Sequence, residues 1–129
     1  MNTKYSYPEL FMRLGIELAT IIFLKKNGDF RVMLGTRNLR TVELKYGFQG
    51  AALGGHDNRC NINNGNIAVF DMLLGEARSF NVERLVDIEF YGEIRDEAGL
   101  DDAVERFEAF KDAYEKRLAE TSIKDEIFD

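Results

Sequence analysis

Tryptophan is absent from this chain, and proline, cysteine and histidine each occur once. The single cysteine, Cys60, excludes an internal disulfide and fits a reducing compartment. The most apolar stretch, Leu18–Leu24, is far too short to cross a bilayer. The first residues also lack the charged and then apolar pattern of a signal peptide. We therefore expect a cytoplasmic protein with no membrane association.

Residues for metal or nucleophilic chemistry are equally scarce. His56 and Cys60 are the only soft metal ligands, so a zinc site would need two carboxylates in addition, which is an unusual set. A Cys60–His56 pair with Asp57 beside it is formally available, but spacing in a Gly/Asn-rich loop does not create the geometry. No glycine motif has the order of a phosphate cradle. We expect no catalytic site, no metal and no cofactor, and hence a protein that is not an enzyme.

The negative charge is concentrated at one end of the chain. Residues 1–92 hold 11 Lys/Arg and 10 Asp/Glu, whereas residues 93–129 hold 6 and 13, so the two parts carry +1 and −7. An acidic protein is a poor non-specific DNA binder, because backbone binding replaces condensed counterions with Lys and Arg. The acidic part favours a basic protein partner or a solvated surface.

Two strand-turn-strand segments predict the fold. In Thr20–Thr36, a run rich in β-branched and aromatic residues leads to Asn27-Gly28, which tolerates the positive φ angles of a tight hairpin turn. After the turn, Phe30, Val32 and Leu34 alternate with the residues of the other face. Asn66–Tyr91 forms the second segment, with a turn near Gly75 and one helical turn at residues 82–85 before a closing strand. The capping-box pattern Ser6-Tyr7-Pro8-Glu9 predicts a short helix that ends at Gly15.

The remaining segments are a loop candidate and a helix. Residues 37–65 fit no single period, and their Gly/Asn-rich part, 47–65, is expected to be a loop or a bulged strand. Leu100–Ala119 repeats apolar residues every three to four positions, which predicts an amphipathic acidic helix. Thr121–Asp129 is expected to be a short mobile tail. We therefore predict an α+β fold over a single domain, 1–129: a helix in 1–16, a small antiparallel β-barrel in 17–92, and the acidic helix and tail in 93–129.

Basic and aromatic residues share the barrel part of the sequence. Small barrels bind nucleic acid with such a mixture of a charged groove and stacking platforms. A continuous basic stripe is not assured, because ten acidic residues lie in the same part. The candidate nucleic-acid or ligand contacts are Lys25, Lys26, Arg31, Arg37, Arg40 and Arg78, with Phe30, Tyr46 and Phe48 between them.

Three segments also carry a family resemblance: Phe23–Leu39, Ile67–Asp71 and Ala77–Leu85. They resemble the two hairpin motifs of a family of small phage proteins with an Sm-like, SH3-type barrel related to the ligand-binding WYL domain. The tryptophan positions of those motifs hold other residues here, with Phe70 at the first. With Tyr5–Leu10 and the added helix, the chain is similar to the small RNA polymerase-binding proteins of T-even-type phages.

This resemblance implies a non-catalytic phage protein that binds the host bacterial RNA polymerase core in the host cytoplasm and modulates transcription. The acidic helix would then act partly as a charge mimic of DNA. One alternative is a nucleic-acid-binding Sm-like barrel, and another is a WYL-like sensor of a small ligand or nucleotide that uses Arg78, Ser79 and Phe80. The candidate partner contacts on the helix are Glu105, Glu108, Asp112 and Glu115, with Phe107 and Tyr114 as exposed aromatics.

Overall fold

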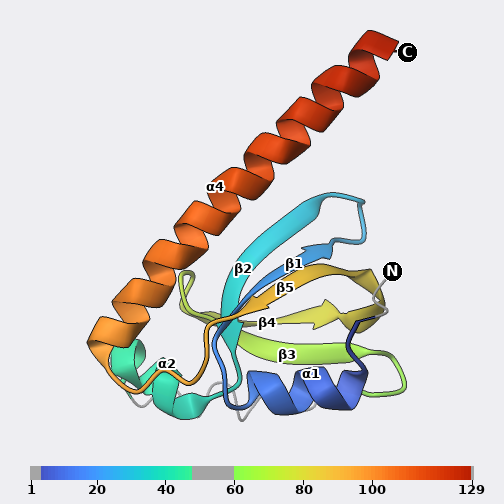
Figure 1. Cartoon of the computed structure of the whole chain (residues 1–129). Coiled ribbons are helices and arrows are strands. Elements are labelled where there is room, and N and C mark those ends of the chain that lie inside the picture. Colours follow the sequence, from blue (N-terminus) through green and yellow to red (C-terminus); the bar gives the residue numbers. More distant parts are fainter. Residues whose placement is uncertain (1–3, 48–59, 129) are drawn as a thin grey trace.

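A computed structural model describes residues 4–47 and 60–128, with side chains up to residue 120. Five strands form one antiparallel sheet, and helices lie before, between and after them (Figure 1). The elements in chain order are α1 (Tyr7–Leu14), β1 (Ala19–Leu24), β2 (Phe30–Thr36), α2 (Leu39–Tyr46), β3 (Asn66–Asp71), β4 (Glu76–Asn81), the 3₁₀ helix η2 (Val82–Arg84), β5 (Leu85–Phe90) and α4 (Glu97–Phe128).

Helix α1 begins with the predicted capping box. The Ser6 hydroxyl accepts a hydrogen bond from the Glu9 backbone N–H, and the Glu9 side chain accepts one from the Ser6 N–H. These bonds satisfy backbone donors that have no partner within the helix. Leu10 and Leu14 are fully buried against the sheet, and Gly15 ends the helix as predicted.

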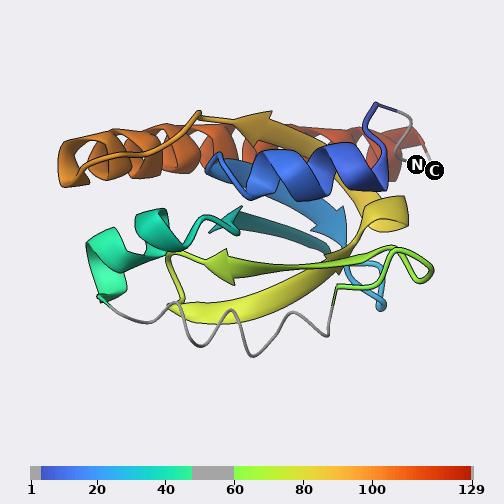
Figure 2. The same cartoon turned by 90° about the horizontal axis from the view of Figure 1, so that it is seen from below.

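The sheet has the strand order β4-β3-β2-β1-β5, and Figure 2 shows β4 and β5 at its opposite edges. Strands β1 and β2 pair from Ala19↔Gly35 to Leu24↔Phe30, around a turn in which Gly28 has φ +91°. The predicted first hairpin is therefore confirmed. The second is confirmed as well, because β3 and β4 pair along their whole length around Gly75, which has φ +74°.

Two apolar clusters occupy the two faces of the sheet, because neighbouring residues of a strand point to opposite faces. The first contains alternate residues of β1, including Ile21 and Phe23, together with α1 and the inner residues of the other strands. The second lies under α2 and α4 and contains Leu34, Phe70 and Phe107. The fold class is confirmed as α+β, with a five-stranded antiparallel sheet, a short N-terminal helix and a long C-terminal helix.

Part of the segment 37–65, which fits no single period in the sequence, forms helix α2. The Asn38 side chain caps it by accepting a hydrogen bond from the Arg40 N–H, and its residues Thr41 and Val42 are buried. The Tyr46 hydroxyl donates to the Met72 carbonyl at 2.5 Å, which ties the helix end to the β3–β4 turn. Most of the Gly/Asn-rich loop predicted over 47–65 lies outside the described residues.

Helix α4 is longer than predicted at both ends. It begins at Glu97 rather than Leu100, and it continues to Phe128, so the expectation that the helix ends near Ala119 was wrong. Figure 1 shows the helix anchored beside α2 at its start and rising away from the sheet toward its C-terminus. No helix in the described part of the chain combines the length and apolar composition that crossing a bilayer requires.

Candidate functional site

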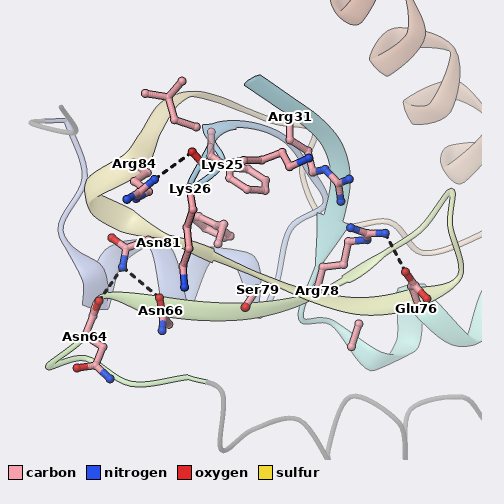
Figure 3. A pocket seen from close by; sticks show the side chains of 14 residues that line it. Lys25, Lys26, Arg31, Asn64, Asn66, Glu76, Arg78, Ser79, Asn81 and Arg84 are labelled. Atoms are coloured by element: carbon pink, nitrogen blue, oxygen red, sulfur yellow. Dashed lines mark hydrogen bonds and ion pairs between the residues drawn. The ribbon is translucent and has the colours of Figure 1, made fainter. Parts of the chain in front are cut away.

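A pocket of about 790 Å³ opens between the β1–β2 hairpin, strand β4 and helix η2 (Figure 3). We call it the basic pocket, because five cationic residues and a single carboxylate line it. The carboxylate is Glu76 of β4. The cations are Lys25, Lys26, Arg31, Arg78 and Arg84.

The floor of the basic pocket is apolar. Phe23 of β1 and Phe80 of β4 pack with their ring centroids 5.9 Å apart, and both side chains are buried. The pairing of β1 with β5 shifts register between Ile22 and Phe23, which marks a β-bulge beside the pocket. Bulges bend a strand and redirect its side chains. The floor is thus a fixed part of the core, and the charged side chains stand around it.

Two of the three arginines of the basic pocket, Arg78 and Arg84, are held from one side. Arg84 Nη1 donates to the Lys25 carbonyl at 3.0 Å. Arg78 Nη2 donates to Glu76 Oε1 at 2.9 Å, and Arg78 Nε lies 3.9 Å from the buried Asp71 carboxylate. This Nε atom is buried and has no hydrogen-bond partner. The contacts orient both guanidinium groups and leave part of each donor set unused.

No ion pair engages Lys25, Lys26 or Arg31 within the described part of the chain. The three cations lie close to the turn of the first hairpin, Lys25 and Lys26 before the turn and Arg31 after it. Their charges are therefore not neutralised by any residue that the structure describes.

Asparagine side chains form the end of the basic pocket near η2. Asn81 Nδ2 donates to the Asn64 carbonyl at 2.7 Å and to Asn66 Oδ1 at 3.1 Å. Asn81 Oδ1 accepts from the Glu83 N–H and so caps η2. The Ser79 hydroxyl lies on β4 with its side chain exposed (Figure 3). Neutral donors and acceptors thus accompany the cations.

Two of the six predicted basic contacts lie elsewhere. Arg37 Nη1 donates to Cys60 Sγ at 3.0 Å and to the Ala68 carbonyl, and its guanidinium stacks over Phe11, 4.4 Å from the ring centroid. Arg40 lies on α2, beside Glu93 rather than at the basic pocket. The structure therefore brings Lys25, Lys26, Arg31 and Arg78 together and separates Arg37 and Arg40 from them.

Phe30 and Tyr46, two of the aromatic residues proposed between those cations, do not line the pocket. Phe30 packs edge-to-face on Tyr114, and Tyr46 packs on Phe70 with a centroid distance of 5.2 Å. Phe48 lies outside the described residues. Sequence reasoning also missed Arg84 and the asparagines, because only the strand pairing and the one-turn helix η2 bring them to the same place.

The second charged surface is a row of carboxylates along α4. Its members recur at intervals of four, three, four and three residues, which places them on one side of the helix. All five side chains are exposed, and none of them forms an ion pair or hydrogen bond with another described residue. At 1.5 Å per residue the row spans roughly 21 Å. We call it the acidic row: Asp101, Glu105, Glu108, Asp112 and Glu115.

The aromatic contacts proposed on α4 need a correction. Phe107 is 1% exposed and belongs to the core under the helix, so it is not available to a partner. Tyr114 is half-buried against Phe30, with centroids 6.1 Å apart. Burial and the nearby Asp87 carboxylate raise the pKa of Tyr114. Periodicity identified the apolar side of the helix, but the barrel of the same chain covers it.

Within residues 4–47 and 60–128, no three His, Cys, Asp or Glu side chains gather as metal ligands would. His56 and Asp57, the other members of the formal Cys60 pair, lie outside the described residues. Cys60 itself accepts hydrogen bonds from Arg37 and from the Ala68 N–H at 3.1 Å, so its sulfur serves the packing of β3.

Comparison with protein families gives one match. The model described as WYL_2, Sm-like SH3 beta-barrel fold, matches residues 8–86, which is 79 of the 129 residues. The chain belongs to the WYL_2 family. No curated protein and no solved structure matches the sequence.

The WYL_2 match includes one of the two charged surfaces and leaves the other outside it. Every residue that lines the basic pocket lies within 8–86, so this pocket is part of the WYL_2 barrel. Helix α4 begins at Glu97, after the match ends, so the acidic row is an addition to the barrel. The expected Sm-like, SH3-type barrel is thereby confirmed.

Proposed function

We propose that this WYL_2 protein is a phage-encoded, non-catalytic protein that binds the bacterial RNA polymerase core in the host cytoplasm and modulates host transcription. The observation that carries the proposal is the acidic row, which lies on the exposed side of a helix that extends beyond the barrel. The resemblance of Tyr5–Leu10 and of the added helix to phage polymerase-binding proteins supports the choice of partner.

The charge density of the row suits a surface that normally receives nucleic acid. Five carboxylates over roughly 21 Å give one charge every ~5 Å of helix axis. One strand of B-DNA carries a phosphate every 3.4 Å along its axis. Enzymes that hold DNA present Lys and Arg to those phosphates, so a straight row of carboxylates complements such a surface.

Two features keep the row available. The carboxylates form no ion pair with any described residue, so their charge is not neutralised within this part of the chain. Leu100, Ala103 and Phe107 are buried on another side of α4, which fixes the direction in which the row points. Arg106 also stacks over Tyr91, 4.9 Å from the ring centroid, and secures the first turns of the helix. A partner would therefore meet a preorganised surface.

The test measures the affinity of the full chain for purified RNA polymerase core at two salt concentrations. The test variant neutralises the row with Glu105→Gln, Glu108→Gln, Asp112→Asn and Glu115→Gln. If each carboxylate contributes roughly 0.5 kcal/mol as an exposed ion pair, the variant loses about 2 kcal/mol, which is roughly 30-fold in Kd. The loss should shrink as salt rises, since exposed charges are screened.

A matched control changes the net charge by the same +4 at other places. Glu43→Lys and Glu93→Lys together do this on α2 and in the segment before α4, where both side chains are exposed. The control should retain the affinity of the natural chain. Equal affinities for the row variant and the natural chain, with the same salt dependence, would rule out the acidic row as the contact. Absence of binding by the natural chain would reject the polymerase itself.

A further inference from the structure

We infer that two copies of this chain pair through α4, with the C-terminal end of each α4 packed into a groove beside the barrel of the other copy. We call residues 119–128 the terminal segment, because they continue the helix past Leu118, which lines this groove. The inference does not depend on the polymerase proposal.

The groove lies between α4 and strand β2. Two hollows of about 270 and 240 Å³ form it, and both are lined by Arg31, Val32 and Lys111. The first hollow extends along α4 to Leu118, and the second extends to Leu74 in the β3–β4 turn. Both volumes lie below the ~300–1,000 Å³ range of small-molecule pockets. The groove therefore suits the side chains of a protein partner better than a separate small ligand.

Apolar side chains remain exposed along the groove. Phe30 is 43% exposed, and Leu73 and Leu74 are 39% and 58% exposed. Tyr114 and Leu118 are half-buried on the α4 side. Exposed apolar residues that gather on one surface mark an interaction site, whereas scattered ones do not. A partner that fits the groove therefore brings apolar residues of its own.

Two cations of the groove call for carboxylates as well. Arg31 and Lys111 form no ion pair with any described residue. The Asp71 carboxylate of the lining is 4% exposed, and its Oδ1 accepts from the Leu73 and Leu74 N–H groups, so it is not presented to the cations' solvent side. The groove thus complements a segment in which acidic and apolar residues alternate.

The terminal segment has this composition. Its apolar residues Ile123, Ile127 and Phe128 stand among the carboxylates Glu120, Asp125 and Glu126, with Lys124 as its one cation. Positions 123 and 127 are about one helical turn apart and so share a side of the helix. The cation also has a counterpart, because Glu115 is the exposed carboxylate of the groove. Charge and apolar character therefore match in both directions.

The terminal segment does not reach the groove of its own copy. Helix α4 is one element from Glu97 to Phe128, and Phe107, Lys111 and Leu118 already form one wall of the groove. The helix continues in the same direction, away from the sheet (Figure 1). At 1.5 Å per residue, the terminal segment extends about 15 Å past Leu118.

A second copy related by a twofold rotation solves this geometry. It places its terminal segment in the groove of the first copy and receives the first copy's segment in return, so the two contacts are identical and the assembly closes as a dimer. The two α4 helices then run antiparallel, and each lays an apolar side into a groove, as helical ligands of proteins do.

The first experiment is sedimentation equilibrium of the full chain. The mass should rise from 14.8 kDa for one copy toward twice this value as concentration increases. Leu74→Ser in the groove, and Ile123→Ser with Ile127→Ser in the terminal segment, should each weaken dimerisation at least about tenfold through lost apolar burial. The matched control is Met12→Ser with Ile16→Ser, which removes residues that are 68% and 54% exposed outside the groove. The control should dimerise as the natural chain does.

The second experiment reverses charges on the two sides. One variant carries Arg31→Glu with Lys111→Glu, and the other carries Asp125→Lys with Glu126→Lys. Each exposed ion pair contributes about twofold to an equilibrium constant, so losing the four pairs of a dimer should weaken self-association of each variant roughly 20-fold. A mixture of the two variants restores opposite charges in both contacts and should dimerise like the natural chain.

The outcomes decide the proposal. A natural chain that stays at 14.8 kDa at every concentration would overturn it, and so would reversed variants that dimerise alone or do not dimerise when mixed. Far-UV circular dichroism checks that each variant is folded. If a reversed variant were unfolded, the comparison of Leu74→Ser with the α1 control would decide, and equal masses for these two would overturn the proposal.

The two proposals fail separately. Leu74→Ser should bind the polymerase core as the natural chain does. Glu105→Gln with Glu108→Gln in the acidic row should leave dimerisation unchanged, because neither position lines the groove. Loss of dimerisation in this row variant would contradict the placement of the contact in the groove.

Discussion

Truncation of Phe107 tests how α4 is attached to the barrel. The side chain is 1% exposed and lies in the cluster under the helix with Leu34 and Phe70. Replacing a buried phenylalanine with alanine removes the transfer free energy of the ring and leaves a cavity, which together cost about 3–5 kcal/mol. Against a typical unfolding free energy of ~5–15 kcal/mol for a domain, this is a large fraction. We expect Phe107→Ala to lower the free energy of unfolding by that amount.

The assay is urea unfolding followed by far-UV circular dichroism, a signal to which the long helix contributes strongly. Tyr114→Ala is the matched control, because Tyr114 lies on the same helix but is only half-buried against Phe30. It should cost less than half as much as Phe107→Ala. A cost below about 1 kcal/mol for Phe107→Ala would refute the reasoning, because it would place the ring outside a packed core.

Two further predictions concern a turn and a buried phenol. Gly75 and Gly28 both have positive φ, but a Cβ at Gly75 would lie 3.0 Å from the Tyr46 ring, whereas at Gly28 nothing lies within 4 Å. Both alanine variants should lose about 1–2 kcal/mol from backbone strain, and thermal unfolding should show about 1 kcal/mol more for Gly75→Ala; equal losses would contradict the contact with Tyr46. Burial raises the pKa of Tyr91, whose hydroxyl lies 2.5 Å from that of Thr20, so the folded state retains this proton above the ordinary value near 10. Its stabilising contribution is complete below pH 10 and is lost as pH rises through the higher folded-state pKa; Tyr91→Phe should therefore weaken the alkaline decline of stability, and an identical decline in both proteins would contradict the assignment.

Local signals predicted the hairpins and α1 correctly. Asn27-Gly28 and the Ser6–Glu9 capping box specify backbone conformations through contacts between near neighbours, and both are found as predicted. Helix α2 was not predicted, because its stability depends on burying Thr41 and Val42 under distant elements. Propensity within the segment does not contain that information.

The candidate sites depend on long-range geometry to different degrees. The acidic row follows from helical periodicity alone, so its carboxylates were identifiable from the sequence. The basic pocket joins Lys25 and Lys26 to Arg78 and Arg84, which only strand pairing brings together. Phe107 was assigned to the wrong surface, because periodicity does not reveal which part of the chain covers an apolar face.

The most direct test of the central claim is site-specific crosslinking to the RNA polymerase core. A photo-crosslinking residue in place of Glu108, at the centre of the acidic row, should crosslink the full chain to the β or β′ subunit of the purified core. The same residue in place of the exposed Glu43 on α2 should give no comparable product. Absence of a crosslink from position 108, or equal crosslinking from both positions, would contradict the account.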